Sequence, residues 1–347
     1  MFISTINQKS LNLPKEENKL SDSNRIAWLD ICKGLGILLV VLGHSGFPKE
    51  VQWWIWSFHM PLFFILSGIV FKASKFSSLL GIIKNRSKTL LLPYLVFSIF
   101  VLSGYIIIDQ EESKFLMHYV PKYGWPAIAL WFIPVLFLTE ILYYTITSLV
   151  RSSIWKAIII LSLTLLGYLL SIYKITFPYK VEVVFTAVFF LYLGNTVYKK
   201  LINRIDDQKN ILKIFLIAIL AFIVNVVLCF QNNIRFDLCY NLIGLPQYAY
   251  LSALFGSLSL SLFSVVVSRL KVELMIHVRK ILIFLGLNTL IILAVHQIIM
   301  LILIDISQHF HLHSILSSVI RHPLLWLSMY YIIVLINSRF RFILGRN

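Results

Sequence analysis

The stretch RIAWLDICKGLGILLVVLGHS, residues 25–45, is long and apolar enough to cross a bilayer as a helix. It nevertheless contains Asp30, Lys33 and His44, three groups that are costly to hold in lipid. Lys33 and His44 are separated by about 1100° of helical rotation, which is three full turns plus roughly 20°, and by roughly 16 Å along the axis. Both therefore lie near one face of the helix. Asp30 precedes Lys33 by three residues and can neutralise it there. The spacing predicts a polar stripe, with an acid–base pair at one end and an imidazole at the other.

A simpler interpretation of this helix is also open. Asp30 and Lys33 could be interfacial groups that reach the lipid headgroups, with His44 only ending the helix. The same helix contains three glycines, which we expect to let neighbouring helices approach closely. They are Gly34, Gly36 and Gly43.

Membrane-spanning stretches of this kind recur along the whole chain. Of its 347 residues, 59% are hydrophobic and only 13% are charged, a composition that a soluble domain cannot bury. The sequence predicts an all-α polytopic bundle of about ten transmembrane helices over residues 25–347. Residues 1–24 are polar, lack the order of a signal peptide, and are expected to form a flexible cytoplasmic tail. The ten predicted spans are 28–47, 52–71, 89–108, 127–149, 154–172, 181–198, 211–230, 247–267, 280–303 and 323–340.

The distribution of charge fixes the expected orientation. The net charge is +16, and most Lys and Arg residues lie in the N-terminal tail and in the alternate loops on the same side. This pattern predicts that both termini are cytoplasmic. The basic residues are therefore topology signals and contacts for anionic lipids, and no nucleic-acid partner is expected. The oligomeric state is not determined by these patterns.

Two further histidines lie in apolar spans at similar predicted depth. His59 precedes Pro61, which removes a helical hydrogen bond and should border a protein-lined cavity. His296 lies in the outer part of the ninth predicted span. We expect these two rings and His44 to meet around a shared wet chamber. No metal site is expected: the three cysteines lack ligand spacing, and the alternating histidines of residues 309–313 fit a solvated loop better than a metal site.

These residues resemble a known family, the acyltransferase-3 membrane O-acyltransferases, and within it the fucose 4-O-acetylase-like branch. The resemblance is dense over residues 25–94 and thinner afterwards. It is carried by Arg25, Trp28-Leu29-Asp30, Lys33-Gly34, Gly43-His44, Ser57 to Phe64, Ser67-Gly68, Leu130-Trp131-Phe132, Leu193-Gly194-Asn195, Gly286 to Thr289 and His296.

The resemblance implies a bacterial integral membrane enzyme that moves acyl groups, usually acetyl from acetyl-CoA, onto sugar hydroxyls of surface glycans. His44 occupies the slot of the family's first-helix histidine, and Lys33 stands where many relatives have arginine. Relatives bind acyl-CoA through an Arg-x-x-Arg segment. Here Arg86 matches the first arginine, but Thr89 replaces the second. The residues expected to bind acyl-CoA are Arg25, Lys84, Arg86 and Lys88.

The chemistry expected from these residues is O-acetylation, with acetyl-CoA as co-substrate and no bound cofactor. Imidazole accepts a proton near neutral pH, so His44 is the candidate base. His59 and His296 are candidates for orienting it or for stabilising an oxyanion, and an acyl-histidine relay remains an alternative. The Lys33–His44 face is expected to line a cavity that the thioester enters from the cytosol. Candidate substrate contacts are Trp131, Glu140 and Asn288.

Two alternatives to this function stay open at the level of sequence. A transporter or flippase of lipid-linked saccharide would also need many helices and buried polar groups, although no internal repeat is visible. An O-acyltransferase using succinyl or another acyl group has the same sequence features. The expected location is the bacterial cytoplasmic membrane. The acceptor could be capsule, O-antigen, exopolysaccharide or a lipid-linked sugar.

Overall fold

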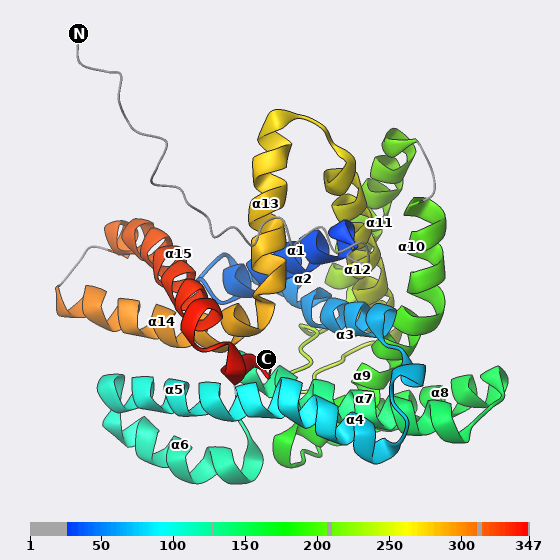
Figure 1. The fold of residues 1–347 in the computed structure, drawn as a ribbon, viewed down its shortest axis with the longest axis horizontal. Helices are drawn as coiled ribbons and strands as arrows, with labels where there is room; N and C mark the ends of the chain where they lie inside the picture. Colours follow the sequence, from blue (N-terminus) through cyan, green and yellow to red (C-terminus); the bar gives the residue numbers. More distant parts are fainter. Residues whose placement is uncertain (1–25, 127, 207–209, 311–313, 346–347) are drawn as a thin grey trace.

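The computed structural model describes residues 26–126, 128–206, 210–310 and 314–345, and among these the regular elements are helices (Figure 1). Arg25 and the predicted tail 1–24 lie outside the described residues. The elements are α1 (Ala27–Gly43), α2 (Lys49–Trp56), α3 (His59–Val70), η2 (Ala73–Lys75), α4 (Leu79–Arg86), η3 (Ser87–Leu91), α5 (Leu92–Ile108), α6 (Gln110–Tyr123), η4 (Ala129–Trp131), α7 (Phe132–Leu149), α8 (Ser153–Ile172), η5 (Pro178–Lys180), α9 (Val181–Leu193), η6 (Gly194–Tyr198), α10 (Lys199–Asp206), α11 (Ile211–Gln231), α12 (Pro246–Arg269), α13 (Glu273–Leu287), α14 (Thr289–His309), α15 (Ser314–Arg339) and η7 (Arg341–Leu344).

The predicted all-α polytopic bundle is confirmed. Within the described ranges, nine helical segments are long and apolar enough to cross a membrane, and they correspond to the second to tenth predicted spans. The first predicted span corresponds to α1, which has 17 residues. At 1.5 Å per residue it is about 26 Å long, slightly less than the roughly 30 Å hydrocarbon core of a bilayer.

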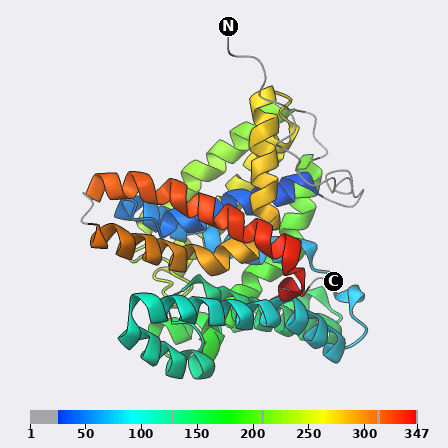
Figure 2. The same cartoon turned by 60° about the vertical axis from the view of Figure 1, so that its left-hand side comes forward.

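Two of the predicted spans contain a break in the helix. The span 52–71 is divided into α2 and α3 at Ser57 and Phe58, and the span 280–303 is divided into α13 and α14 at Asn288. Figures 1 and 2 show α13 running at a steep angle to α14. An apolar run does not reveal such a break, because the freed backbone groups are satisfied by partners elsewhere in the chain.

Close helix crossings occur at glycines, as predicted for the first helix. A Cβ on Gly34 would lie 2.1 Å from the carbonyl oxygen of Leu282, and a Cβ on Gly286 would lie 1.9 Å from that of Asp30. The backbones of α1 and α13 are therefore in direct contact. A second crossing joins α3 to η6, since a Cβ on Gly194 would lie 2.1 Å from the carbonyl oxygen of Ile65. These crossings fix the positions of the helices that carry the histidines.

The α1–α13 crossing gives a stability prediction. Gly286→Ala places a methyl group against backbone, which cannot move aside without separating the two helices, so we expect a loss of about 1–3 kcal/mol. The midpoint of thermal unfolding of the purified protein in detergent measures it. The control is Gly81→Ala in α4, where the nearest atom is Ser78 Oγ at 3.4 Å. If both variants unfold at the same temperature, the close crossing is wrong.

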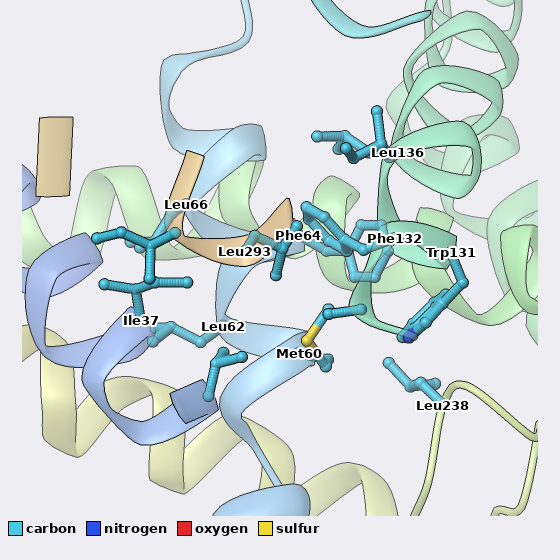
Figure 3. Packing of buried hydrophobic residues seen from close by; sticks show 14 of the residues in the cluster. Ile37, Met60, Leu62, Phe64, Leu66, Trp131, Phe132, Leu136, Leu238 and Leu293 are labelled. Atoms are coloured by element: carbon cyan, nitrogen blue, oxygen red, sulfur yellow. The ribbon is translucent and has the colours of Figure 1, made fainter. Parts of the chain in front are cut away.

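The core packs around α3 and the start of α7. Figure 3 shows Phe64 against Phe132, and their ring centroids are 4.9 Å apart. Met60, Trp131 and Leu238, labelled in the same view, all line one cavity. These residues come from α3, η4 and the connection between α11 and α12. Aromatic packing thus joins helices from distant parts of the chain at the edge of a cavity.

Candidate active site

Two of the three predicted histidines line one cavity of about 190 Å³, and the third packs behind it against His44. His44 and His59 line it, and the ring centroids of His44 and His296 are 5.5 Å apart. His59 and His296 are buried, at 6% and 1% exposure. The expected chamber is thus shared by His44 and His59, whereas His296 contacts His44 but does not line the cavity. The residues lining the cavity are Val40, His44, Trp56, His59, Met60, Ala129, Trp131, Asp237, Leu238, Cys239, Tyr240 and Gln297.

Gln297 holds His44 in one tautomer. Its Oε1 accepts a hydrogen bond from the backbone N–H of Ala129 at 2.6 Å, so its Nε2 is the atom that faces His44. That Nε2 donates to Nδ1 of His44 at 3.2 Å. Nδ1 is thus the accepting nitrogen of the neutral ring, and the proton of His44 lies on Nε2.

The other two imidazoles carry their protons on the opposite nitrogen. Nδ1 of His59 donates to the carbonyl of Ile55 at 2.9 Å, and Nδ1 of His296 donates to that of Ile292 at 2.9 Å. Each ring therefore has an unprotonated Nε2. The Nε2 of His296 is buried without a hydrogen-bond partner. The cluster thus combines one ring that can donate from Nε2, that of His44, with two rings whose Nε2 has a lone pair.

The position of His59 depends on the break between α2 and α3, which a buried amide supports. Asn225 of α11 is fully buried, accepts from Nε1 of Trp54 at 2.7 Å and donates to Oγ of Ser57 at 3.2 Å. It also contacts Ser252 of α12 at 2.9 Å. Because this amide joins Trp54 and Ser57, on either side of the end of α2, to α12, the network fixes the turn that precedes His59.

The acid–base pair of the first helix forms but does not line this cavity. Lys33 Nζ lies 3.3 Å from Asp30 Oδ1. Of α1, only Val40 and His44 line the cavity, and Ile37, between them and Lys33, is fully buried in the core. The predicted cavity along the whole Lys33–His44 face is therefore not observed. A path for a thioester from the cytosolic side remains a prediction.

The remaining predicted site residues have different surroundings. Trp131 lines the cavity, as expected for a substrate contact. Glu140 does not: it is buried and forms an ion pair with Arg86. Asn288 does not line it either, because its Oδ1 accepts from Asn337 Nδ2 at 2.7 Å and its Nδ2 donates to Phe284.

The predicted acyl-CoA residues lie on the helix that leads into α5. Lys84 and Lys88 are exposed and one turn apart, while Arg86 extends toward α7, pairs with Glu140 and lies 5.6 Å from the Phe76 ring centroid. Arg25 lies outside the described residues, as do residues 311–313 of the alternating histidines. Among the described residues no group of His, Cys, Asp or Glu has the arrangement of a metal site.

Sequence reasoning missed several cavity residues. Gln297 follows His296 directly in an apolar helix. A polar amide in such a span indicates a functional site in the same way as an imidazole does. Trp56 has no such signal, since it is one of three tryptophans close together near a predicted membrane interface. Tyr240 lies in a connection with no recognisable motif. Only the folded chain brings it to the cavity that His44 lines.

The chain matches one known family of proteins. The family model for the acyltransferase-3 acyltransferase domain matches residues 26–338. The chain belongs to this family. The match confirms the predicted acyltransferase, a multi-pass membrane protein, and does not test the fucose 4-O-acetylase-like branch, which stays a prediction. No curated protein and no solved structure matches the chain significantly.

The geometry of this acyltransferase provides the groups that acyl transfer requires. A transfer to a hydroxyl needs a lone pair that accepts the hydroxyl proton, and a donor that stabilises the oxyanion of the tetrahedral intermediate. His59 and His44 offer these two functions on one cavity wall. A fixed tautomer on each ring avoids reorganisation during the reaction.

Proposed function

We propose that the protein is an O-acetyltransferase that moves acetyl from acetyl-CoA to a hydroxyl of a bacterial surface polysaccharide or its lipid-linked precursor. The observation that carries this proposal is the pair of oppositely protonated imidazoles, His44 and His59, on one small cavity. A cavity of about 190 Å³ is below the roughly 300–1,000 Å³ of pockets for drug-sized ligands. Its size suits an acetyl group beside one sugar ring better than a longer acyl chain.

In the proposed reaction His59 is the base. Its Nε2 accepts the proton of the sugar hydroxyl as the hydroxyl oxygen attacks the thioester carbonyl, and the Nε2–H of His44 donates to the developing oxyanion. Collapse of the tetrahedral intermediate breaks the carbon–sulfur bond, and the departing CoA thiolate takes the proton back from His59. This assignment reverses the roles expected from the sequence, because Gln297 occupies the Nδ1 lone pair of His44.

The donor is proposed to bind on the cytoplasmic side of the bacterial cytoplasmic membrane. Lys84, Arg86 and Lys88 lie in the basic segment before α5, where cations can pair with the phosphates of CoA. The ion pair to Glu140 uses Nε of Arg86 and so orients the guanidinium. This fixed orientation supports Arg86 as a phosphate ligand despite the missing second arginine of the family motif.

Label transfer tests the proposed function. Purified protein in detergent, given acetyl-labelled CoA and surface polysaccharide, should move label into the polysaccharide, and succinyl-CoA should react far more slowly. A transporter would leave acetyl-CoA intact and move saccharide across vesicles. Mass spectrometry of the surface glycan with and without the protein then identifies the acceptor. Absence of label transfer to every glycan, with the protein folded, would contradict the proposal.

A further inference from the structure

The connection between α11 and α12, residues 232–245, forms a rigid wall of the cavity. Asp237 and Leu242 exchange two backbone hydrogen bonds of 2.8 Å each. Asn232 donates to the carbonyl of Ile243 at 3.0 Å and accepts from the N–H of Leu245 at 2.8 Å, which closes the base of the loop. Asn241 donates to the carbonyl of Gly167 in α8 at 3.2 Å. The loop is therefore anchored within itself and to the bundle.

This loop places a carboxylate in the cavity. Asp237 is 8% exposed and lines the cavity together with His44. Its Oδ2 accepts from Arg235 Nη2 at 2.8 Å, and its Oδ1 accepts from the N–H of Cys239 at 3.0 Å. The backbone N–H of Tyr240 is a third donor to this carboxylate. A carboxylate has about four lone-pair sites, so one remains for a ligand. Burial raises the pKa of Asp237, and the Arg235 guanidinium opposes that rise and favours the charged form.

Arg235 is itself held against the site. Its guanidinium lies 3.6 Å from the ring centroid of Trp56, and the Trp56 and His44 ring centroids are 5.9 Å apart. Such a cation–π contact restricts the guanidinium and, through it, the carboxylate. The chain Trp56–Arg235–Asp237 thus links the imidazole cluster to the loop. None of these groups has a role in the acetyl-transfer step described above.

The other walls of the cavity suit a sugar ring. Trp56, Trp131 and Tyr240 line it, and aromatic side chains offer apolar faces on which the C–H face of a pyranose can stack. A carboxylate beside aromatic faces is an acceptor for sugar hydroxyl groups. Arg235 is already committed to Asp237 and Trp56, so an acidic sugar would bring a second carboxylate against Asp237 without a cation of its own.

We propose that Asp237 is an acceptor-specificity residue, which binds a non-reacting hydroxyl of an uncharged sugar ring in the cavity, with Arg235 and Trp56 as its positioning residues. This inference rests on the proposed function, in that the acceptor is a sugar. It adds the subsite and its preference for an uncharged ring. It also places the acceptor on the side of the molecule where this loop lies, which the charge pattern predicts to be external.

The test measures binding without acetyl-CoA, so that it does not depend on catalysis. The probes are tritiated methyl hexopyranosides of the gluco, galacto and manno series and their monodeoxy analogues, with full-length protein in nanodiscs. We expect the wild type to bind at least one, and Asp237→Asn to weaken that binding between about tenfold and a hundredfold, as for loss of a charged hydrogen bond. The matched control is Asp305→Asn, an exposed carboxylate of α14, which should change nothing.

The monodeoxy analogues separate hydroxyl recognition from a purely structural role. One analogue should bind the wild type as weakly as the parent sugar binds Asp237→Asn, and the variant should show no further loss for that analogue. An equal additional loss for every analogue would overturn the proposal, as would the absence of binding of any glycoside to the wild type. If Asp237→Asn does not fold, Asp237→Glu, which displaces the carboxylate by one methylene, should alter the ranking of the analogues, and an unchanged ranking overturns the proposal.

Failure of this inference differs from failure of the proposed function. Acetyl transfer to a glycan that is unaffected by Asp237→Asn overturns the inference and leaves the function intact. Hydroxyl-dependent sugar binding without any label transfer supports the inference and contradicts the acetyltransferase.

Discussion

Replacement of His59 by glutamine should reduce acetyl transfer by about 10²–10⁴-fold, whereas His44→Gln should retain a clearly larger fraction of the rate. Glutamine cannot act as a base, so it cannot replace the Nε2 lone pair that we assign to His59. Its amide N–H can partly replace the Nε2–H donor that we assign to His44, because that role needs only a hydrogen bond to the oxyanion. The initial rate of label transfer at equal amounts of folded protein measures both.

The control for this pair is His277→Gln. His277 is exposed on α13, and its Nδ1 lies 3.2 Å from the carbonyl of Glu273, the same type of bond that His59 makes to Ile55. Its replacement should leave the rate unchanged. Loss of all activity in His44→Gln together with substantial activity in His59→Gln would return the base to His44. His44→Ala removes the Nε2–H donor, or the base if the two roles are exchanged, so its rate should fall by at least about 10²-fold under either assignment.

The second large effect concerns the buried ion pair between Arg86 and Glu140. Glu140→Ala leaves the guanidinium without its carboxylate between α4 and α7, and breaking a buried pair in this way costs about 3–5 kcal/mol. We expect a correspondingly large fall in the midpoint of thermal unfolding. Glu111→Ala is the control, because its partner Lys114, at 2.7 Å on α6, forms an exposed pair, worth at most about 1 kcal/mol.

Removing both charges separates stability from donor binding. The double variant Arg86→Met with Glu140→Leu leaves no unpaired charge, so its stability should return close to that of the wild type. Its KM for acetyl-CoA should still rise, because the proposed phosphate contact is gone. A double variant with wild-type KM for acetyl-CoA would restrict this pair to a structural role and remove Arg86 from the donor site.

The class of structure, and the residues whose side chains can take part in catalysis, follow from the sequence. Apolar runs must become helices in lipid, because the bilayer offers no partner for free backbone groups, and so the spans were predictable one by one. His44 and His59 are joined by a short connection, which brought them to similar depth without knowledge of the fold. Gly34 predicted a close crossing for a local reason, the absence of a side chain.

The tertiary structure alone decided which groups share the cavity and how they are protonated. The bond from Gln297 to His44 and the pairing of Glu140 with Arg86 each join atoms whose separation along the chain is unrelated to their distance in space. The loop that carries Asp237 reaches His44 only because α11 and α12 pack beside α1 to α3. Helical periodicity fixes which face of one helix a residue occupies, but the face of another helix that it meets depends on packing of the whole bundle.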